Sequence, residues 1–315
     1  MKDEMRVFSG SAHRELAEAI CADLRIPLSA STTKRFRNDN LYVQLCETVR
    51  ERDVFIVQPF YPAHVSDHIL ELAFMMDAAR SASARRVTAV IPYYSYSRSD
   101  KKDEPHISIA GRLLADLLTA AGAQHVVTMT MHSPQVHGFF SVPTDHLSSM
   151  KVLVEYFQSQ NLTRACVVTP DLGNIKRATR FARLLQLPVV AISKKRISDT
   201  KVVVDGVIGE VAGSHAIIVD DEIAVGSSMI EAVKALRPFG VTQATLVCTH
   251  GLFCDEALER LFALPEVDAI VTTDTVPIPQ RQAMPKLHVL SIAPVFADAI
   301  RRIHAGESMQ IHFEY

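Results

Sequence analysis

The stretch Ile217-Ile-Val-Asp-Asp-Glu-Ile-Ala-Val-Gly-Ser-Ser228 carries the strongest indication of fold in this sequence. Its apolar beginning predicts a buried strand over 216–219, and apolar residues at helical spacing predict a helix over 227–236. Two adjacent carboxylates, Asp220 and Asp221, follow the end of the strand. A wholly apolar strand that leads into a helix is typical of a parallel sheet with helices on both faces.

The same alternation extends outward from this stretch in both directions. Strands are also predicted over 6–8, 54–57, 87–91, 126–129, 166–168, 189–192, 244–248, 269–271 and 288–290. Helices are predicted from residue 12, with Ser11 as the cap, from Ser66, over 109–121, 176–185 and 255–262, and from 297. The pattern predicts an α/β protein with two domains, each built on a mostly parallel sheet with helices on both faces, and a boundary within 143–149.

The composition argues against several classes of protein. The chain has 315 residues, of which 48% are hydrophobic and 22% charged, as in soluble globular proteins. Its 33 basic and 35 acidic residues give a net charge of −2, without the basic excess of a nucleic-acid binder. No apolar run approaches the ~18 residues of a membrane-spanning helix, and the first residues lack the pattern of a signal peptide. Five widely spaced cysteines without a CxxC pair indicate buried thiols, so we expect a cytoplasmic protein that binds neither nucleic acid nor membranes.

The turn after Asp221 has the features of a phosphate site. The backbone N–H groups from Val225 to Ser228 are expected to point out of the turn and the helix start, where an anion can accept from them. The carboxylates of Asp220 and Asp221 can accept hydrogen bonds from sugar hydroxyls. Together these groups favour a sugar phosphate as ligand, although the same residues fit a plain strand-end turn with two solvated acids.

Two other predicted strands lead into polar segments. Asp171 follows the strand at 166–168, where it can ligate Mg²⁺ or simply cap the next helix. The loop 91–103 carries three tyrosines, Arg98 and two lysines. These side chains suit a polyphosphate joined to a flat base, and they equally suit a solvated basic loop.

Cations and a histidine follow two further strands. The cations of 193–196 can neutralise a transferring phosphoryl group or can form a surface charge run, and the polar stretch 197–201 beyond them is expected to be mobile. His132 follows the strand at 126–129, and a single histidine is a weak indication of a ligand. The sequence has no P-loop, GxGxxG, GxSxG or zinc-spaced motif, which argues against a P-loop kinase.

Segments along the whole chain resemble ribose-phosphate pyrophosphokinase, in that family's order and spacing. They are Phe8-Ser-Gly10, Phe55-Ile-Val-Gln58, Ala89-Val-Ile-Pro-Tyr93, 115–122, Gly138-Phe-Phe140, 167–178, Ile218-Val-Asp-Asp221, Thr249-His-Gly-Leu-Phe253 and 299–304. The resemblance implies two phosphoribosyltransferase-like domains, 1–147 and 148–296, with a C-terminal helix at 297–315 that packs back on the first. It implies transfer of the diphosphoryl group of ATP to the anomeric hydroxyl of ribose 5-phosphate, with Mg²⁺ as cofactor. The products would be phosphoribosyl diphosphate (PRPP), a precursor in nucleotide biosynthesis, and AMP.

The resemblance also assigns roles to single residues. The family's catalytic residues are matched by Lys194, Arg196 and His132, and its metal-binding positions by His132 and Asp171. Its ATP site is matched by Phe36, Asn38, Asn40, Arg98, Ser99, Asp100, Lys101 and His132. Its ribose 5-phosphate site is matched by Asp171, Asp220, Asp221, Ala224, Val225, Gly226, Ser227 and Ser228. In the family the positions matched by Phe36, Asn38 and Asn40 receive adenine from a neighbouring subunit, which implies a homo-oligomer, either a hexamer or a dimer.

Several positions in and around these sites depart from the family's usual residues. Ala224 and Val225 stand where an aspartate and a threonine are usual, and Asn174 stands where a glycine is usual. Two alternatives therefore stay open: a poorly active regulatory or scaffold subunit that binds nucleotide, and a phosphoribosyltransferase that consumes PRPP. The presence of Lys194, Arg196 and His132 favours the enzyme over the regulatory subunit.

Overall fold

The computed structural model describes residues 5–198, 201–211, 213–278 and 284–312, and the side chains of 194–205 lie outside this description. The chain forms two compact units. Unit 1 comprises Met1–Ser148, Thr275–Pro277 and Ser291–Tyr315, and unit 2 comprises Ser149–Asp274 and Ile278–Leu290. The predicted assignment of 1–147 and 148–296 to separate domains stays a prediction.

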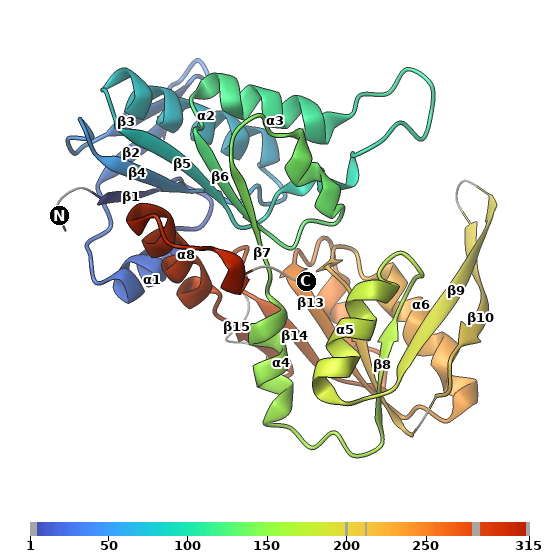
Figure 1. Cartoon of the computed structure of the whole chain (residues 1–315). Coiled ribbons are helices and arrows are strands. Elements are labelled where there is room, and N and C mark those ends of the chain that lie inside the picture. The colour runs from blue at the N-terminus through green and yellow to red at the C-terminus, as the bar shows by residue number, and fades with distance from the viewer. Residues whose placement is uncertain (1–4, 199–200, 212, 279–283, 313–315) are drawn as a thin grey trace. The chain divides into compact units, whose positions relative to one another are not determined.

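Unit 1 contains a five-stranded parallel sheet in the order β1-β4-β5-β6-β7 (Figure 1). Its strands are β1 (Met5–Ser9), β4 (Asp53–Val57), β5 (Arg86–Ile91), β6 (His125–Met129) and β7 (Thr144–Leu147). Four of them were predicted within one or two residues at each end, while β7 was missed because its residues, TDHL, are mostly polar. The order shows that successive strands pair as neighbours, as parallel sheets of this class do.

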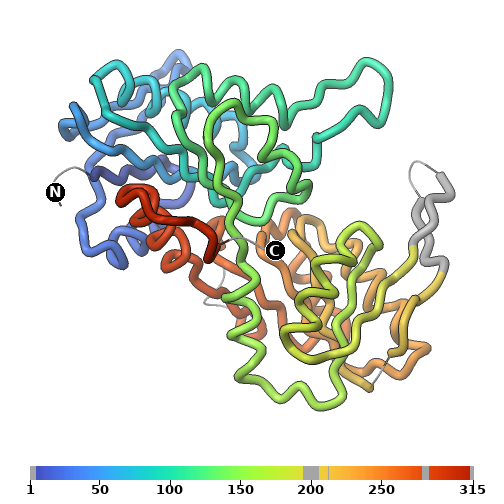
Figure 2. Tube along the Cα trace, viewed as in Figure 1, coloured from blue at the N-terminus to red at the C-terminus, as the bar shows by residue number. Residues whose placement is uncertain are grey.

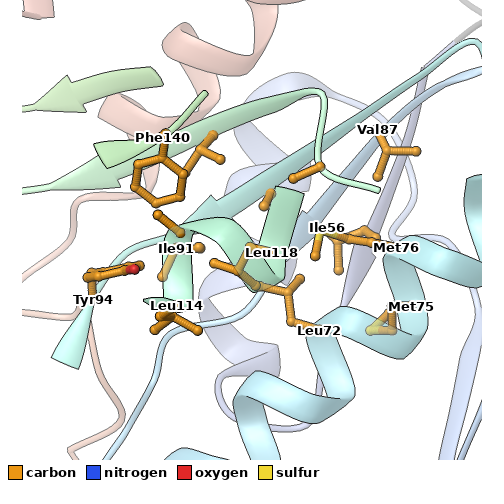
Figure 3. Packing of buried hydrophobic residues seen from close by; sticks show 14 of the residues in the cluster. Ile56, Leu72, Met75, Met76, Val87, Ile91, Tyr94, Leu114, Leu118 and Phe140 are labelled. Carbon is orange, nitrogen blue, oxygen red and sulfur yellow. The ribbon is translucent and has the colours of Figure 1, made fainter. Parts of the chain in front are cut away.

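Helices cover both faces of this sheet, as the sequence predicted. Phe8 and Ile56 pack in one apolar cluster with α2 (Val65–Ser81) and α3 (Ala110–Ala121). Figure 3 shows side chains from that cluster, among them Ile56, Leu72, Met76 and Leu118. Val7 and Phe55, at alternate positions of the same strands, pack on the other face with α1 (Arg14–Leu24) and α8 (Ala293–Ala305). Figure 2 shows α1, in blue, beside α8, in red.

Two helix ends differ from the predicted ones. The cap of α1 is His13, whose ring Nδ1 accepts from the backbone N–H of Leu16 at 3.4 Å. Ser11, the predicted cap, instead donates its hydroxyl to Glu71 Oε2 at 2.6 Å. The last helix was predicted over 297–315, yet α8 begins at Ala293 and ends at Ala305. It ends there because Gly306 adopts a left-handed conformation, with φ 70°, that glycine accepts without strain.

Unit 1 also contains an antiparallel hairpin that was not predicted, β2 (Ser31–Arg35) and β3 (Leu41–Leu45). Polar residues such as Lys34 and Gln44 interrupt its apolar pattern. The hairpin is tied to α2 by an ion pair between Arg35 Nη2 and Asp67 Oδ2 at 2.7 Å. The turn joins the two strands through an N–H of Phe36 that donates to the carbonyl of Asn40 at 2.9 Å.

Unit 2 contains a second sheet in the order β10-β9-β8-β11-β13-β14-β15, with β12 paired to β13. Its strands are β8 (Ala165–Thr169), β9 (Val189–Ser198), β10 (Lys201–Ile208), β11 (His215–Val219), β12 (Glu222–Ile223), β13 (Gln243–Gly251), β14 (Val267–Thr273) and β15 (Leu287–Leu290). All pairings are parallel except that of β10 with β9. The stretch 197–201 was expected to be mobile. In this stretch β9 continues to Ser198 and β10 begins at Lys201, while 199 and 200 lie outside the described residues, so its mobility stays a prediction.

Helices again pack on both faces of this sheet. One apolar cluster joins it to α4 (Met150–Gln158) and α5 (Ile175–Leu185), and another joins it to α6 (Ser227–Leu236) and α7 (Ala257–Phe262). The bounds of α6 agree with the prediction, α7 begins two residues later than predicted, and α4 was not predicted. Across both units, no helix within the described ranges is long and apolar enough to cross a membrane.

Candidate active site

Three carboxylates of unit 2 lie at the carboxyl ends of two neighbouring strands. Asp171 follows β8, and Asp220 and Asp221 follow β11, which pairs with β8 in parallel. Asn174 links all three: its side-chain Nδ2 donates to Asp220 Oδ1 at 2.6 Å and to Asp221 Oδ1 at 3.2 Å. Its backbone N–H donates to Asp171 Oδ1 at 3.1 Å. The structure thus brings together the three aspartates that the sequence singled out, and it adds Asn174, which sequence reasoning did not place in the site.

The two carboxylates of the aspartate pair are buried. Asp220 is 8% exposed and Asp221 is 2% exposed. Burial raises the pKa of Asp220 well above its ordinary value, and the neighbouring carboxylate of Asp221 raises it further. The backbone carbonyl of Asp221 accepts N–H bonds from Thr249 and His250, both at 3.0 Å, so the end of β11 is held by β13. A buried pair of carboxylates is a set of strong acceptors for the hydroxyls of a ligand.

The segment from Ala224 to Ser228 joins this acidic end to the start of α6. Gly226 is the N-cap of α6 with φ 75°, and a β-carbon there would meet the side chain of Leu261 at 3.2 Å. Both the conformation and the contact therefore favour glycine. Val225 is 40% exposed, and Ser227 and Ser228 are exposed at the helix start. The first N–H groups of a helix have no partner within it, so this end of α6 can bind an anion.

The predicted nucleotide residues of unit 1 gather in two loops that contact each other. Arg98 ends a short 3₁₀ turn, Ser95–Arg98, and Ser99 Oγ accepts from the backbone N–H of Ala110 at 3.0 Å. The backbone N–H of His132, just beyond β6, donates to Ser97 Oγ at 3.3 Å. Gln135 Nε2 donates to Asp100 Oδ2 at 3.1 Å. The structure thus joins the loop of Arg98, Ser99 and Asp100 to the loop of His132, two segments that the sequence indicated separately.

Lys101 and the hairpin residues are more exposed. Lys101 Nζ pairs with Asp103 Oδ1 at 3.3 Å. Phe36, which is 48% exposed, lies edge-on to Tyr42 with ring centroids 5.6 Å apart. Asn38 and Asn40 are both exposed, and Asn38 Oδ1 accepts from the backbone N–H of Asn40 at 3.3 Å.

A cation stacks on this aromatic pair. Lys34 Nζ lies 5.4 Å from the Phe36 ring and 4.6 Å from the Tyr42 ring, an arrangement of the cation–π type. Sequence reasoning missed Lys34 and Tyr42, because only the pairing of β2 with β3 places them opposite each other.

Lys194 and Arg196 lie on β9, and their side chains fall outside the described residues. Their backbones pair with Val204 and Val202 of β10. The roles of these two cations therefore stay predictions.

The carboxylates near Asn174 have the chemistry that suits Mg²⁺. The described part of the chain has no group of three or more His, Cys, Asp or Glu side chains arranged to hold a metal ion on its own. Mg²⁺ usually binds through one or two carboxylates and completes its shell with water and substrate phosphates. The half-buried carboxylate of Asp171 offers oxygen ligands of that kind. The residues present thus fit a magnesium ion that a phosphorylated substrate helps to bind.

Comparisons with known proteins identify the family. A model for the N-terminal domain of ribose phosphate pyrophosphokinase matches residues 5–122, and one for a phosphoribosyl synthetase-associated domain matches 193–314. A putative ribose-phosphate pyrophosphokinase of Streptomyces coelicolor is 54% identical over 311 residues, which cover 99% of this chain and 98% of that protein. The chain belongs to the ribose-phosphate pyrophosphokinase family.

Two further members of the family match this chain over almost its full length. The ribose-phosphate pyrophosphokinase of Deinococcus radiodurans is 51% identical over 317 residues, covering 99% of this chain and 98% of the relative. The crystal structure of phosphoribosylpyrophosphate synthetase from Mycobacterium smegmatis superposes with a TM-score of 0.89 at 35% identity, covering 96% of this chain and 100% of that one. The predicted α/β fold with phosphoribosyltransferase-like domains is confirmed. Membership of the family also confirms an enzyme that transfers a diphosphate group, and it does not favour the regulatory subunit.

Proposed function

We propose that this chain transfers the diphosphoryl group of ATP to the anomeric hydroxyl of ribose 5-phosphate, giving PRPP and AMP. The observation that carries this function is the buried Asp220–Asp221 pair next to the exposed start of α6. Such a site offers carboxylate acceptors for a sugar and N–H donors for its phosphate. The names of the relatives that match the chain over its full length agree with it.

We assign the sugar phosphate to the carboxyl end of β11 and the start of α6. Asp220 and Asp221 would accept the ribose hydroxyls, with Asp171 close by. The N–H groups at Val225, Gly226, Ser227 and Ser228, together with the two serine hydroxyls, would bind the phosphate at the positive end of the helix dipole. Ala224 and Val225 contribute no side-chain donor, so binding relies on the backbone.

We assign ATP to unit 1. Arg98, Ser99, Asp100, Lys101 and His132 belong to the two contacting loops, where cations can bind the phosphates. Phe36, Asn38 and Asn40 would serve the adenine of a neighbouring subunit, since the exposed Phe36 ring offers a surface for a flat base. This assignment makes the protein a homo-oligomer, a hexamer or a dimer.

In the reaction, the anomeric oxygen forms a bond to the β-phosphorus while the bond from that phosphorus to the α–β bridging oxygen breaks. AMP leaves with the electron pair, and the hydroxyl proton passes to water. Lys194 and Arg196 would stabilise the negative charge on the transferred group, as positioned cations do in phosphoryl transfer. Asp171 would hold Mg²⁺, whose charge would offset that of the phosphates, and His132 keeps its predicted metal-binding role within unit 1. A cytoplasmic location is proposed because all five cysteines are free thiols.

A direct test is steady-state release of AMP from Mg-ATP, with and without ribose 5-phosphate. We expect AMP to form only when the sugar is present and in equal amount to PRPP. Nucleotide binding without turnover would instead support the regulatory subunit. Consumption of PRPP with a free base would support a phosphoribosyltransferase.

A further inference from the structure

Asn174 contacts both carboxylates of the proposed sugar site, and no role has been assigned to it. It is the N-cap residue of α5, with φ −92° and ψ 7°, yet its side chain makes no capping hydrogen bond. Its backbone N–H donates to Asp171 Oδ1 at 3.1 Å, and its carbonyl accepts from the N–H of Ala178 at 3.0 Å. These two hydrogen bonds fix the position of the Asn174 main chain, from which the side-chain amide extends.

The Asn174 amide has two hydrogens and meets two acceptors. Its Nδ2 lies 2.6 Å from Asp220 Oδ1 and 3.2 Å from Asp221 Oδ1. Asp220 Oδ1 also accepts the backbone N–H of Asp221 at 2.9 Å. Two adjacent buried carboxylates repel each other, and a donor shared between them offsets part of that repulsion. The shared amide also fixes the rotation of each carboxylate, and so fixes where its second oxygen lies.

We propose that Asn174 is a positioning residue that holds Asp220 and Asp221 in the arrangement that accepts the two hydroxyls of a ribose. The inference rests on the proposed sugar site at these aspartates. A ribose presents two neighbouring O–H donors at a constant spacing. Acceptors that are already fixed at a matching spacing bind them with a smaller loss of conformational entropy.

Substitution of Asn174 tests the proposal through a selective effect on the sugar. Asn174→Asp keeps the shape but replaces the donor with a third carboxylate. We expect the KM for ribose 5-phosphate to rise about tenfold or more, equivalent to about 1.4 kcal/mol, with kcat and the KM for ATP within about twofold. Asn174→Ala should act in the same direction by about threefold to tenfold, because it removes the donor without adding charge.

A sugar analogue separates positioning from a general structural effect. The inhibition constant of 2-deoxyribose 5-phosphate, which lacks one of the two hydroxyls, should change less in both variants than the KM for ribose 5-phosphate. Asn161→Asp is the matched control, since Asn161 is exposed in the loop before β8, at the opposite end of that strand. This control should leave both constants unchanged, and thermal unfolding of each variant shows whether it is folded.

The outcomes separate a failure of the role of Asn174 from a failure of the proposed sugar site. An unchanged or lower KM for ribose 5-phosphate in Asn174→Ala, or an equal rise in the KM for ATP, would overturn the role of Asn174. Asp220→Asn is assayed in parallel and should raise the KM for ribose 5-phosphate. If it does not, the proposed sugar site itself is wrong. If Asn174→Asp does not fold, Asn174→Ala and Asn174→Ser carry the test.

Discussion

The negative charge of Asp220 favours substrate binding but lowers the stability of the folded protein. Burial and the adjacent Asp221 raise its pKa above the ordinary 3.8, so the folded chain binds a proton there more tightly than the unfolded chain does. The ionised carboxylate therefore costs stability as the pH rises from about 4 through the raised pKa. Where the pH is high enough to ionise Asp220, the folded protein bears this cost, and the ionised carboxylate is a strong acceptor for a sugar hydroxyl.

We predict that Asp220→Asn raises the unfolding temperature by about 2–4 °C near pH 7, as expected for a gain of about 1 kcal/mol. The difference should shrink as the pH falls toward 4, because wild-type Asp220 then becomes protonated as well. Differential scanning fluorimetry across this pH range measures the effect. A variant less stable than the parent at pH 7 would show that the carboxylate is compensated by its surroundings.

Lys194 is predicted to act in the chemical step. Removal of an ammonium that stabilises charge on the transferred group should lower kcat by about 100-fold or more in Lys194→Ala, with smaller changes in both KM values. Lys234→Ala, which removes an exposed ammonium from the last turn of α6, is the control. Turnover of Lys194→Ala at the parental rate would rule out this role.

Site residues could be predicted from the sequence where they lie just after the end of a single strand. Asp171, Asp220 and Asp221 were found in this way, because each lies within three residues of the end of an apolar run. Asn174 was not placed in the site, because its contact with Asp220 joins residues 46 apart and depends on β8 and β11 being neighbours. A spacing pattern within one segment contains no information about that pairing.

At the scale of elements, the turn between β12 and α6 should be the weak point of substrate binding. The double change Ala224→Asp, Val225→Thr gives the loop the family's usual side chains and adds a hydrogen-bonding hydroxyl beside the phosphate. We predict a KM for ribose 5-phosphate lower by about tenfold, or about 1.4 kcal/mol. Steady-state kinetics at saturating Mg-ATP compare the two proteins. An unchanged or higher KM would mean that the loop is adapted to another ligand.

The carboxylate of Asp298, in α8, contacts two arginines of the same helix and His312 in the segment that follows it. Arg301 Nη2 donates to Asp298 Oδ1 at 2.6 Å, while Arg302 Nε and His312 Nε2 lie 2.6 and 2.7 Å from Oδ2. Burial alone would raise the pKa of Asp298, but the hydrogen bonds from Arg302, Arg301 and His312 outweigh it and hold this pKa below 3.8. The stabilisation is therefore fully present above pH 3.8 and is lost as the pH falls below it.

We predict that Asp298→Asn increases hydrogen exchange over residues 293–312 at neutral pH, and that its effect on the unfolding temperature shrinks progressively as the pH falls below 3.8. Asp23→Asn changes the charge equally at an exposed position of α1 and serves as the control. Destabilisation by Asp298→Asn that does not decrease as the pH falls below 3.8 would indicate a loss of packing instead of charge.

Elements were predictable where hydrophobic periodicity is strong, as in β4, whose five residues are all buried, and in α6. The β2–β3 hairpin was missed because its strands are half-exposed and mixed in polarity. The extension of β9 and β10 into 197–201 was not predicted, because polar residues in a hairpin at the edge of a sheet resemble a loop.

At the scale of the whole molecule, the exposed hairpin predicts an oligomer whose ATP sites are shared between subunits. Phe36→Ala should raise the KM for ATP while light scattering still shows an oligomer. Mixing inactive Lys194→Ala with Phe36→Ala, followed by dissociation and reassembly, should restore part of the activity, because each subunit supplies what the other lacks. A fully active monomer, or no recovery on mixing, would contradict a shared site.

Phosphorus NMR of the reaction of this chain with Mg-ATP and ribose 5-phosphate shows directly which group is transferred. Transfer of a diphosphoryl group predicts that the β and γ signals of ATP are replaced by the two coupled signals of a sugar-bound diphosphate. The α signal should become that of AMP in equal amount. Formation of ADP with a singly phosphorylated anomeric position, or an unchanged spectrum from protein that binds ATP, would show that the chain is not a diphosphoryl transferase.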